Sequence, residues 1–146
     1  MEEMLSRADP VRLLVVDDCP DTVQSLSRLL ELWGFDALAA GDGASALELA
    51  GLHRPGVVLL DLALPGMDGL EFVRRLREED ARPRPLVVCM SGLGDEDVRH
   101  RCLEAGCDLH LAKPTDPQAL RRLLERLART FGEVRHRSGA EAMGGS

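Results

Sequence analysis

The chain has 146 residues and a formal net charge of −7, and 45% of its residues are hydrophobic while 29% are charged. A chain of this length and apolar content can bury one substantial core, so we expect a single globular domain. The acidic charge disfavours direct binding to nucleic acid or to an anionic membrane, and no apolar run is long enough to cross a bilayer, so we expect a cytoplasmic protein.

Short apolar or β-leaning runs alternate along the chain with segments of helical periodicity. The runs have the length of strands and cover residues 12–16, 35–39, 57–60, 86–90 and 107–111. Apolar residues at helical spacing predict a first helix around Val23 to Trp33 and later helices over 44–53, 70–79, 95–105 and 117–131. The alternation of apolar strands with helices predicts an α/β fold of three layers, in which helices cover both faces of a parallel sheet.

Glycine and proline residues mark the predicted helix boundaries. Gly34 and Gly106 stand where a left-handed residue would end the first and fourth helices, whereas Pro20 and Pro117 suit a first helical turn. From about residue 132 the sequence loses its apolar stripe and becomes rich in glycine and alanine, so residues 132–146 are expected to form a disordered tail. Residues 1–10 read as an N-terminal extension without the apolar core of a signal peptide, which leaves 11–131 as the folded domain.

Polar residues follow the predicted strands at their carboxyl ends. Asp17 and Asp18 come directly after the first strand, Asp61 after the third, Ser91 after the fourth and Lys113 after the fifth. Because ligands of open parallel sheets bind outside the carboxyl ends of the strands, we expect these side chains to share one pocket. Lys113 is the only lysine of a chain whose other cationic side chains are arginine, which suggests that a compact ammonium is needed there to face an anion.

Three carboxylates in one pocket need a compensating cation. At separations of about 5 Å and an effective dielectric constant near 20, each pair repels by roughly 3 kcal/mol. Hard oxygen ligands without a neighbouring histidine or thiolate pair favour Mg²⁺, which also binds phosphate oxygens. The sequence therefore indicates phosphoryl chemistry at a magnesium site.

Asp61 stands in the segment Asp-Leu-Ala-Leu-Pro-Gly-Met-Asp-Gly, Ser91 comes before a glycine, and Lys113 comes before a proline. Together with the acids after the first strand, these residues closely resemble the receiver domain of two-component response regulators. The resemblance covers about residues 11–131. It implies a flavodoxin-like (βα)5 fold with a five-stranded parallel sheet of order 2-1-3-4-5. It further implies a signalling phosphoprotein that catalyses its own phosphorylation and slow dephosphorylation, without being a conventional enzyme.

The resemblance also assigns roles to single residues. Asp61 would accept a phosphoryl group from a phosphohistidine and form an aspartyl phosphate. Asp17, Asp18, Asp61 and the backbone carbonyl of Ala63 would hold Mg²⁺, and Lys113 would pair with a phosphoryl oxygen. Ser91 would donate its hydroxyl to another phosphoryl oxygen and pull its loop inward, which is the conformational switch.

The implied partners are a histidine kinase or phosphotransfer protein upstream and an effector protein downstream, with no direct contact to nucleic acid or membrane. A dimer formed on phosphorylation stays open, as does a role in a phosphorelay. The chain is interpreted as a stand-alone regulator or as a receiver excised from a hybrid kinase or a larger regulator. A receiver that acts as a scaffold without phosphorylation is the alternative.

His110 departs from the family pattern, because receivers place tyrosine or phenylalanine there as the switch residue that partners read. A simple substitution and a response to pH are both open readings of this imidazole. Cys19, Cys89, Cys102 and Cys107 form no closely spaced metal-ligand pair, so reduced thiols are expected, with Cys19 buried or half-buried.

Two unrelated classes share parts of this pattern. A phosphatase of the haloacid dehalogenase type also uses a strand-end aspartate, but it needs a second acid where this chain has Ala63. A flavodoxin-like flavin binder needs hydroxyls and glycine in its first loop, where Asp17 and Asp18 would repel phosphate.

Overall fold

The computed structural model describes residues 11–62, 69–79, 84–92, 96–113 and 115–144. Five parallel strands form one sheet of order β2-β1-β3-β4-β5, as predicted. The strands are β1 (Arg12–Val16), β2 (Asp36–Ala40), β3 (Val57–Asp61), β4 (Leu86–Ser91) and β5 (Leu109–Ala112). The helices are α2 (Pro20–Leu32), α3 (Gly43–His53), α4 (Gly69–Glu78), α5 (Glu96–Ala105) and α6 (Pro117–Gly144).

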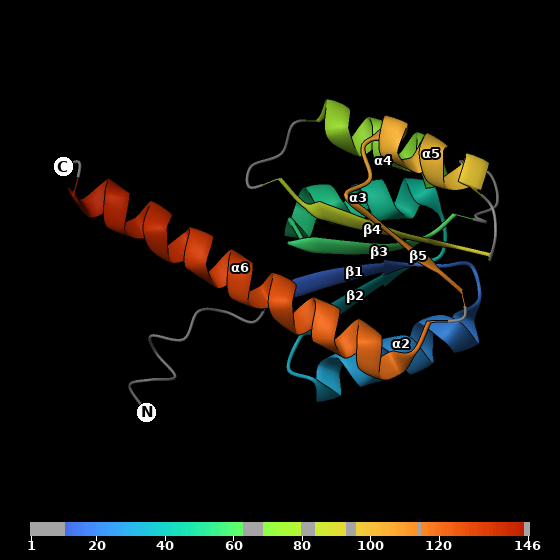
Figure 1. The fold of residues 1–146 in the computed structure, drawn as a ribbon, viewed down its shortest axis with the longest axis horizontal. Helices are drawn as coiled ribbons and strands as arrows, with labels where there is room; N and C mark the ends of the chain where they lie inside the picture. The colour runs from blue at the N-terminus through green and yellow to red at the C-terminus, as the bar shows by residue number, and fades with distance from the viewer. Residues whose placement is uncertain (1–10, 63–68, 80–83, 93–95, 114, 145–146) are drawn as a thin grey trace.

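Helices cover both faces of the sheet (Figure 1). Helices α3, α4 and α5 pack on one face, and α2 and the first half of α6 pack on the other. Alternate residues of a strand point to opposite faces, so β1 divides between the two cores: Leu14 and Val16 belong to one, and Leu13 and Val15 to the other. This explains why the central strands are continuous apolar runs, as buried parallel strands require.

Glycines end α2 and α5 as the sequence predicts. Gly34 has φ of +95° and Gly106 has φ of +116°, a left-handed conformation that glycine adopts without steric cost. The following strands begin slightly later than predicted, because the residues after each glycine still complete the helix end. Phe35 N–H donates to the Leu30 carbonyl, and Cys107 N–H donates to the Cys102 carbonyl, both at 3.0 Å.

Arg77 of α4 clamps the start of β4 to the turn before β5. Its guanidinium donates to the carbonyls of Gly106 and Pro85 at 3.0 and 2.8 Å, and to a carboxylate oxygen of Asp108 at 2.8 Å. The same Asp108 oxygen accepts a hydrogen bond from Val87 N–H at 2.9 Å. One arginine thus satisfies backbone carbonyls from two segments that are distant in sequence.

Helix α6 continues to Gly144, into the segment 132–146 for which the sequence predicts a disordered tail. Figure 1 shows α6 running well past the edge of the sheet. The physical reason is propagation: once a helix is nucleated, each added residue needs only modest intrinsic propensity, and residues 133–143 are rich in glutamate, arginine and alanine. Gly139, the one glycine between residues 133 and 143, lowers the helix propensity without ending the helix.

The expectation of reduced thiols is also wrong, because Cys89 and Cys107 form a disulfide. Cys89 lies on β4 and Cys107 precedes β5, and both side chains are buried in the core under α5. Neighbouring strands bring the two cysteines together although 18 residues separate them in sequence. Spacing along the chain therefore could not reveal the pair. In the described part of the chain, no helix has the length and apolar character of a membrane span.

Candidate functional site

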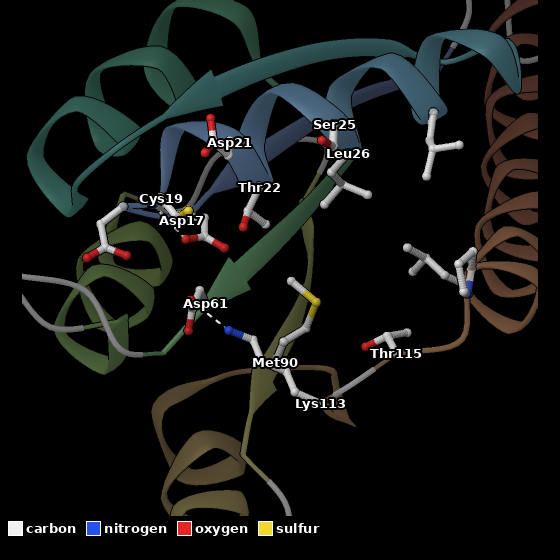
Figure 2. Close-up of a pocket in the computed structure, with 14 residues that line it drawn as sticks. Asp17, Cys19, Asp21, Thr22, Ser25, Leu26, Asp61, Met90, Lys113 and Thr115 are labelled. Carbon is white, nitrogen blue, oxygen red and sulfur yellow. Dashed lines mark hydrogen bonds and ion pairs between the residues drawn. The ribbon is translucent and has the colours of Figure 1, made fainter.

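The site lies where the strand order reverses, at the carboxyl ends of β1 and β3. Val16 of β1 pairs with Leu60 of β3, so the residues that follow them, Asp17 and Asp61, stand side by side. Asp18 comes next along the loop after β1, and Lys113 reaches the same place from the end of β5. Figure 2 shows Asp17, Asp61 and Lys113 converging on one cleft.

Three carboxylates form a compact cluster. One oxygen each from Asp17, Asp18 and Asp61 lies within 4.8 Å of the others. Asp17 and Asp61 are each only 6% exposed, whereas Asp18 is exposed. Burial raises the pKa of Asp17, and the nearby charges of Asp61 and Asp18 raise it further, while a hydrogen bond from Cys19 N–H and the charge of Lys113 act in the opposite direction. A bound cation would therefore offset the repulsion among the three carboxylates.

Lys113 supplies one positive charge to the cluster. Its Nζ lies 2.8 Å from Oδ2 of Asp61, and its backbone N–H donates to the Ser91 carbonyl at 2.7 Å. The backbone bond fixes the end of β5 against the end of β4, so the ammonium is aimed at Asp61 by the sheet itself. The prediction that the only lysine faces an anion at the strand ends is confirmed by this ion pair.

The acidic cluster suits a hard divalent cation. Its three carboxylates offer oxygen donors at separations that one ion can bridge, and two of them, Asp17 and Asp61, are buried, where uncompensated negative charge is costly. Ala63, expected to add a backbone carbonyl, lies outside the described residues.

Ser91 and His110 meet each other beside the acidic cleft. Ser91 Oγ and His110 Nε2 lie 2.7 Å apart, joining the end of β4 to β5. Burial lowers the pKa of His110, and the charge of Arg99 on α5 lowers it further, so both favour the neutral imidazole. Ser91 is expected to donate to a phosphoryl oxygen only once Asp61 is modified. In this unmodified structure its hydroxyl is paired with the imidazole, and Ser91 is not among the residues that line the cleft.

The cleft extends beyond the charged residues to a volume of about 880 Å³. Its far part lies between α2 and the beginning of α6, and sequence reasoning did not assign this wall to the site. The additional lining residues include Leu26, Leu29, Met90, Thr115, Pro117 and Leu120. Their helical or strand spacing indicates core packing, and no sequence signal separates a core leucine from one at the edge of a cleft.

Cys19 also lines the cleft, and the expectation that it is buried or half-buried is wrong. It is exposed at the residue before α2 begins. A side-chain hydrogen bond and a backbone hydrogen bond at Thr22 lower the pKa of the Cys19 thiol. The residue before a helix stands outside the first turn, which accounts for its exposure.

Comparison with known proteins agrees with this geometry. The chain is 38% identical over 123 residues to the DNA-binding response regulator MtrA of Mycolicibacterium smegmatis, and 37% identical over 128 residues to the transcriptional regulatory protein CseB of Streptomyces coelicolor. These alignments cover 84% and 87% of this chain and 53% of each relative, so the chain spans about half the length of these regulators. The name of the first relative does not fit the expectation of a chain without direct contact to nucleic acid.

Solved structures share the fold at lower identity. The chemotaxis protein CheY4 of Vibrio cholerae superposes with a TM-score of 0.75 at 27% identity, covering 81% of this chain and 98% of that one. A CheY-like receiver domain protein from Methanospirillum hungatei gives 0.75 at 26% identity, covering 85% and 98%. A family model described as the response regulator receiver domain matches residues 13–125. The chain therefore belongs to the response regulator receiver domain family of two-component systems.

Proposed function

We propose that this receiver is switched by phosphorylation of Asp61. The upstream partner is a histidine kinase or a phosphotransfer protein that carries a phosphohistidine, and the output is a change of shape read by an effector protein. The observation that carries the proposal is the contact of Asp61 with Lys113 at 2.8 Å, inside a cluster of three carboxylates at the strand ends.

Asp61 is the nucleophile in this proposal. A carboxylate oxygen of Asp61 attacks phosphorus, the bond from phosphorus to the donor imidazole nitrogen breaks, and that imidazole leaves as the neutral base after taking up a proton. Lys113 then contacts a phosphoryl oxygen in place of the unmodified carboxylate. Transfer of this kind depends mainly on positioning and charge compensation, which the fixed ends of β3 and β5 provide.

Asp17, Asp18 and Asp61 would hold Mg²⁺, with a contribution from the Ala63 carbonyl. When bound, the ion compensates the negative charge on the phosphoryl oxygens. The buried position of Asp17 and its hydrogen bond from Cys19 N–H keep its carboxylate oriented toward Asp61. Slow hydrolysis of the same acyl phosphate resets the receiver.

The switch requires Ser91 to change partner. In the unmodified protein its hydroxyl pairs with His110, and after phosphorylation it donates to a phosphoryl oxygen. His110 loses that hydrogen bond and becomes free to change its orientation on β5. The imidazole thus takes the part that an aromatic ring has in other receivers, with a polar contact that a phenylalanine lacks.

The test uses acetyl phosphate as the phosphodonor, Mg²⁺ and intact mass spectrometry. We expect one phosphoryl group, about 80 Da, on the wild type. It should be removed by base, because it is held as an acyl phosphate, and absent from Asp61→Asn. Asp21→Asn is the matched control, since Asp21 lines the same cleft outside the carboxylate cluster. Equal modification of Asp61→Asn would disprove the assignment.

Two broader arrangements remain as alternatives within the family. In one, the receiver works as part of a larger regulator with a neighbouring domain as its output; MtrA and CseB, of which the alignments cover 53%, are longer proteins of this family. A wild type that stays unmodified by acetyl phosphate and by histidine kinases would favour the phosphorylation-independent scaffold.

A further inference from the structure

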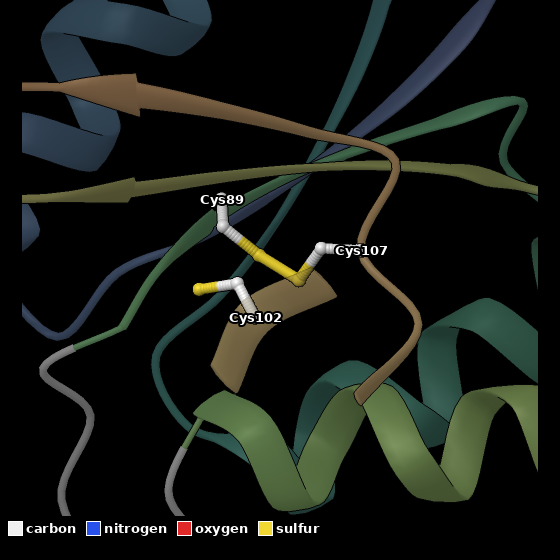
Figure 3. A group of neighbouring side chains, drawn as sticks. All are labelled: Cys89, Cys102 and Cys107. Carbon is white, nitrogen blue, oxygen red and sulfur yellow. A yellow bond between two sulfur atoms is a disulfide. The ribbon is translucent and has the colours of Figure 1, made fainter. Parts of the chain in front are cut away.

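A second cluster of reactive side chains lies away from the acidic cleft. Cys89 on β4, Cys102 on α5 and Cys107 before β5 place their sulfur atoms within 4.8 Å of one another. Cys89 and Cys102 are fully buried and Cys107 is 6% exposed. Figure 3 shows the disulfide between Cys89 and Cys107, with the third thiol beside it.

The surroundings of this cluster favour uncharged sulfur. Its neighbours in the core under α5 are apolar, among them Val87, Phe72 and Val73. A metal held by three thiolates would place net charge there, whereas a disulfide and two thiols are both neutral. Arg77, the cation that packs on Gly106 next to Cys107, already donates to Asp108 and to two backbone carbonyls. Burial raises the pKa of Cys102, in keeping with a neutral thiol.

We propose that Cys89 and Cys107 form a reversible thiol–disulfide site, reduced by dithiols and reoxidised by hydroperoxides, with Cys102 remaining a thiol in both states. Cys107 is the point of entry, because it alone of the three has exposed surface and sits in the turn between α5 and β5. The site shares no residue with the acidic cleft, so the inference does not rest on the proposed phosphorylation.

The reduction balances as an exchange of two electrons and two protons. A thiolate of the dithiol attacks the Cys107 sulfur, the bond to Cys89 breaks, and Cys89 leaves as a thiolate that takes up a proton. The second thiol of the reductant displaces Cys107, which also takes up a proton, and the reductant leaves as its own disulfide.

Reoxidation needs one hydroperoxide. The Cys107 thiolate attacks the peroxide oxygen and forms a sulfenic acid, and an alcohol or water leaves. The Cys89 thiol then attacks the sulfenic sulfur, and water departs as the new disulfide closes.

The bond joins β4, which carries Ser91, to the turn that leads into β5, which carries His110. Cys89 lies two residues before Ser91 on β4, and its register partner on β5 is His110. The covalent loop from Cys89 to Cys107 encloses all of α5. Oxidation should therefore restrict the opening of α5 and of the turn that follows it.

The test follows the full 146-residue chain in native buffer, without a phosphodonor. Protein reduced by a dithiol and protein reoxidised by hydrogen peroxide are alkylated after denaturation and mapped by peptide mass spectrometry. We expect all four cysteines to be alkylated in the reduced form, whereas in the oxidised form Cys102 is alkylated and Cys89 and Cys107 are recovered as the cross-linked pair. Hydrogen exchange should show slower exchange of α5 amides in the oxidised form.

Cys102→Ala is the matched control, because it removes a buried sulfur of the same cluster and should keep both the cross-link and the exchange difference. In Cys89→Ala the oxidant should no longer slow exchange in α5. Reduction that succeeds only in denaturant, or four free thiols under every condition, would overturn the proposal. Protection of the three reduced thiols by added Zn²⁺ would assign the cluster to metal binding and overturn it as well.

Discussion

The hydrogen bond between Ser91 and His110 ties the resting receiver to the protonation state of the imidazole. At 2.7 Å, Ser91 donates to Nε2 when that nitrogen is unprotonated and accepts from it when it carries a proton. Burial and the charge of Arg99 lower the pKa of His110 below its ordinary value of 6.5. The folded protein therefore binds fewer protons at this residue than the unfolded chain does.

This difference predicts how stability depends on pH. With a lowered pKa in the folded state, the contribution of His110 is complete above about pH 6.5 and is lost as the pH falls toward the folded-state pKa. Urea unfolding at a series of pH values should show a loss of stability below pH 6.5 that His110→Gln reduces. His100→Gln, at an exposed position on α5, should keep the wild-type dependence. Parallel curves for wild type and His110→Gln would contradict the prediction.

The pairing of Ser91 with His110 could not be read from the sequence. The sequence places both residues at the ends of neighbouring strands, and the resemblance assigns each a role in switching. The Ser91 hydroxyl can bond either to the His110 ring or to a phosphoryl oxygen. Which bond forms depends on the Ser91 rotamer and on the position of the His110 ring, 19 residues away in sequence. Propensity and periodicity carry no information at that scale.

At the scale of elements, two glycines with the same function have different surroundings. Gly34 and Gly106 both end helices with positive φ, but a Cβ on Gly34 would meet open space, whereas one on Gly106 would lie 2.9 Å from Cγ of Arg77. Arg77 cannot move aside easily, because its guanidinium is held by three hydrogen bonds.

Alanine at these two positions should separate backbone strain from steric conflict. Gly34→Ala should cost about 1 kcal/mol of unfolding free energy, since an L-residue resists the left-handed region. Gly106→Ala should cost roughly 2–3 kcal/mol, because the same strain is joined by displacement of Arg77. Chemical denaturation of the two variants against the wild type measures both values, and equal losses would show that the Arg77 contact adds nothing.

The sequence predicted the elements well where a local pattern encodes them. All five strands and five helices were predicted in the right order, because buried parallel strands and amphipathic helices have distinct periods. The end of α6 was missed, since composition alone does not tell a helix that continues from one that stops. The Cys89–Cys107 bond was missed because it depends on which strands are neighbours.

At the scale of the whole molecule, folding assembles the acidic cleft from segments that lie apart in the unfolded chain. Asp17, Asp18 and Asp61 come within 4.8 Å of one another only when β1 and β3 pair. A divalent cation that binds this cluster therefore binds the folded state alone, which links ion binding to stability.

Added Mg²⁺ should raise the melting temperature. At a concentration ten times the dissociation constant, the linkage amounts to about 1.4 kcal/mol, or a few degrees for a chain of this size. Calorimetry should show this increase for the wild type at pH 7 and a smaller one for Asp18→Asn, with NaCl at matched ionic strength as the control. The increase should shrink at acid pH as the carboxylates become protonated. An unchanged melting temperature would argue against a site for the ion.

Lys113 carries the single side-chain amine of the chain. An acylating reagent directed at amines has no other side chain to label, so its rate of reaction reports directly on what occupies the space in front of Asp61. Acetylation of that one nitrogen removes its positive charge, and with it the salt bridge to Asp61. Under the proposed function, one covalent event at one atom would thus remove the ammonium that pairs with the phosphoryl group.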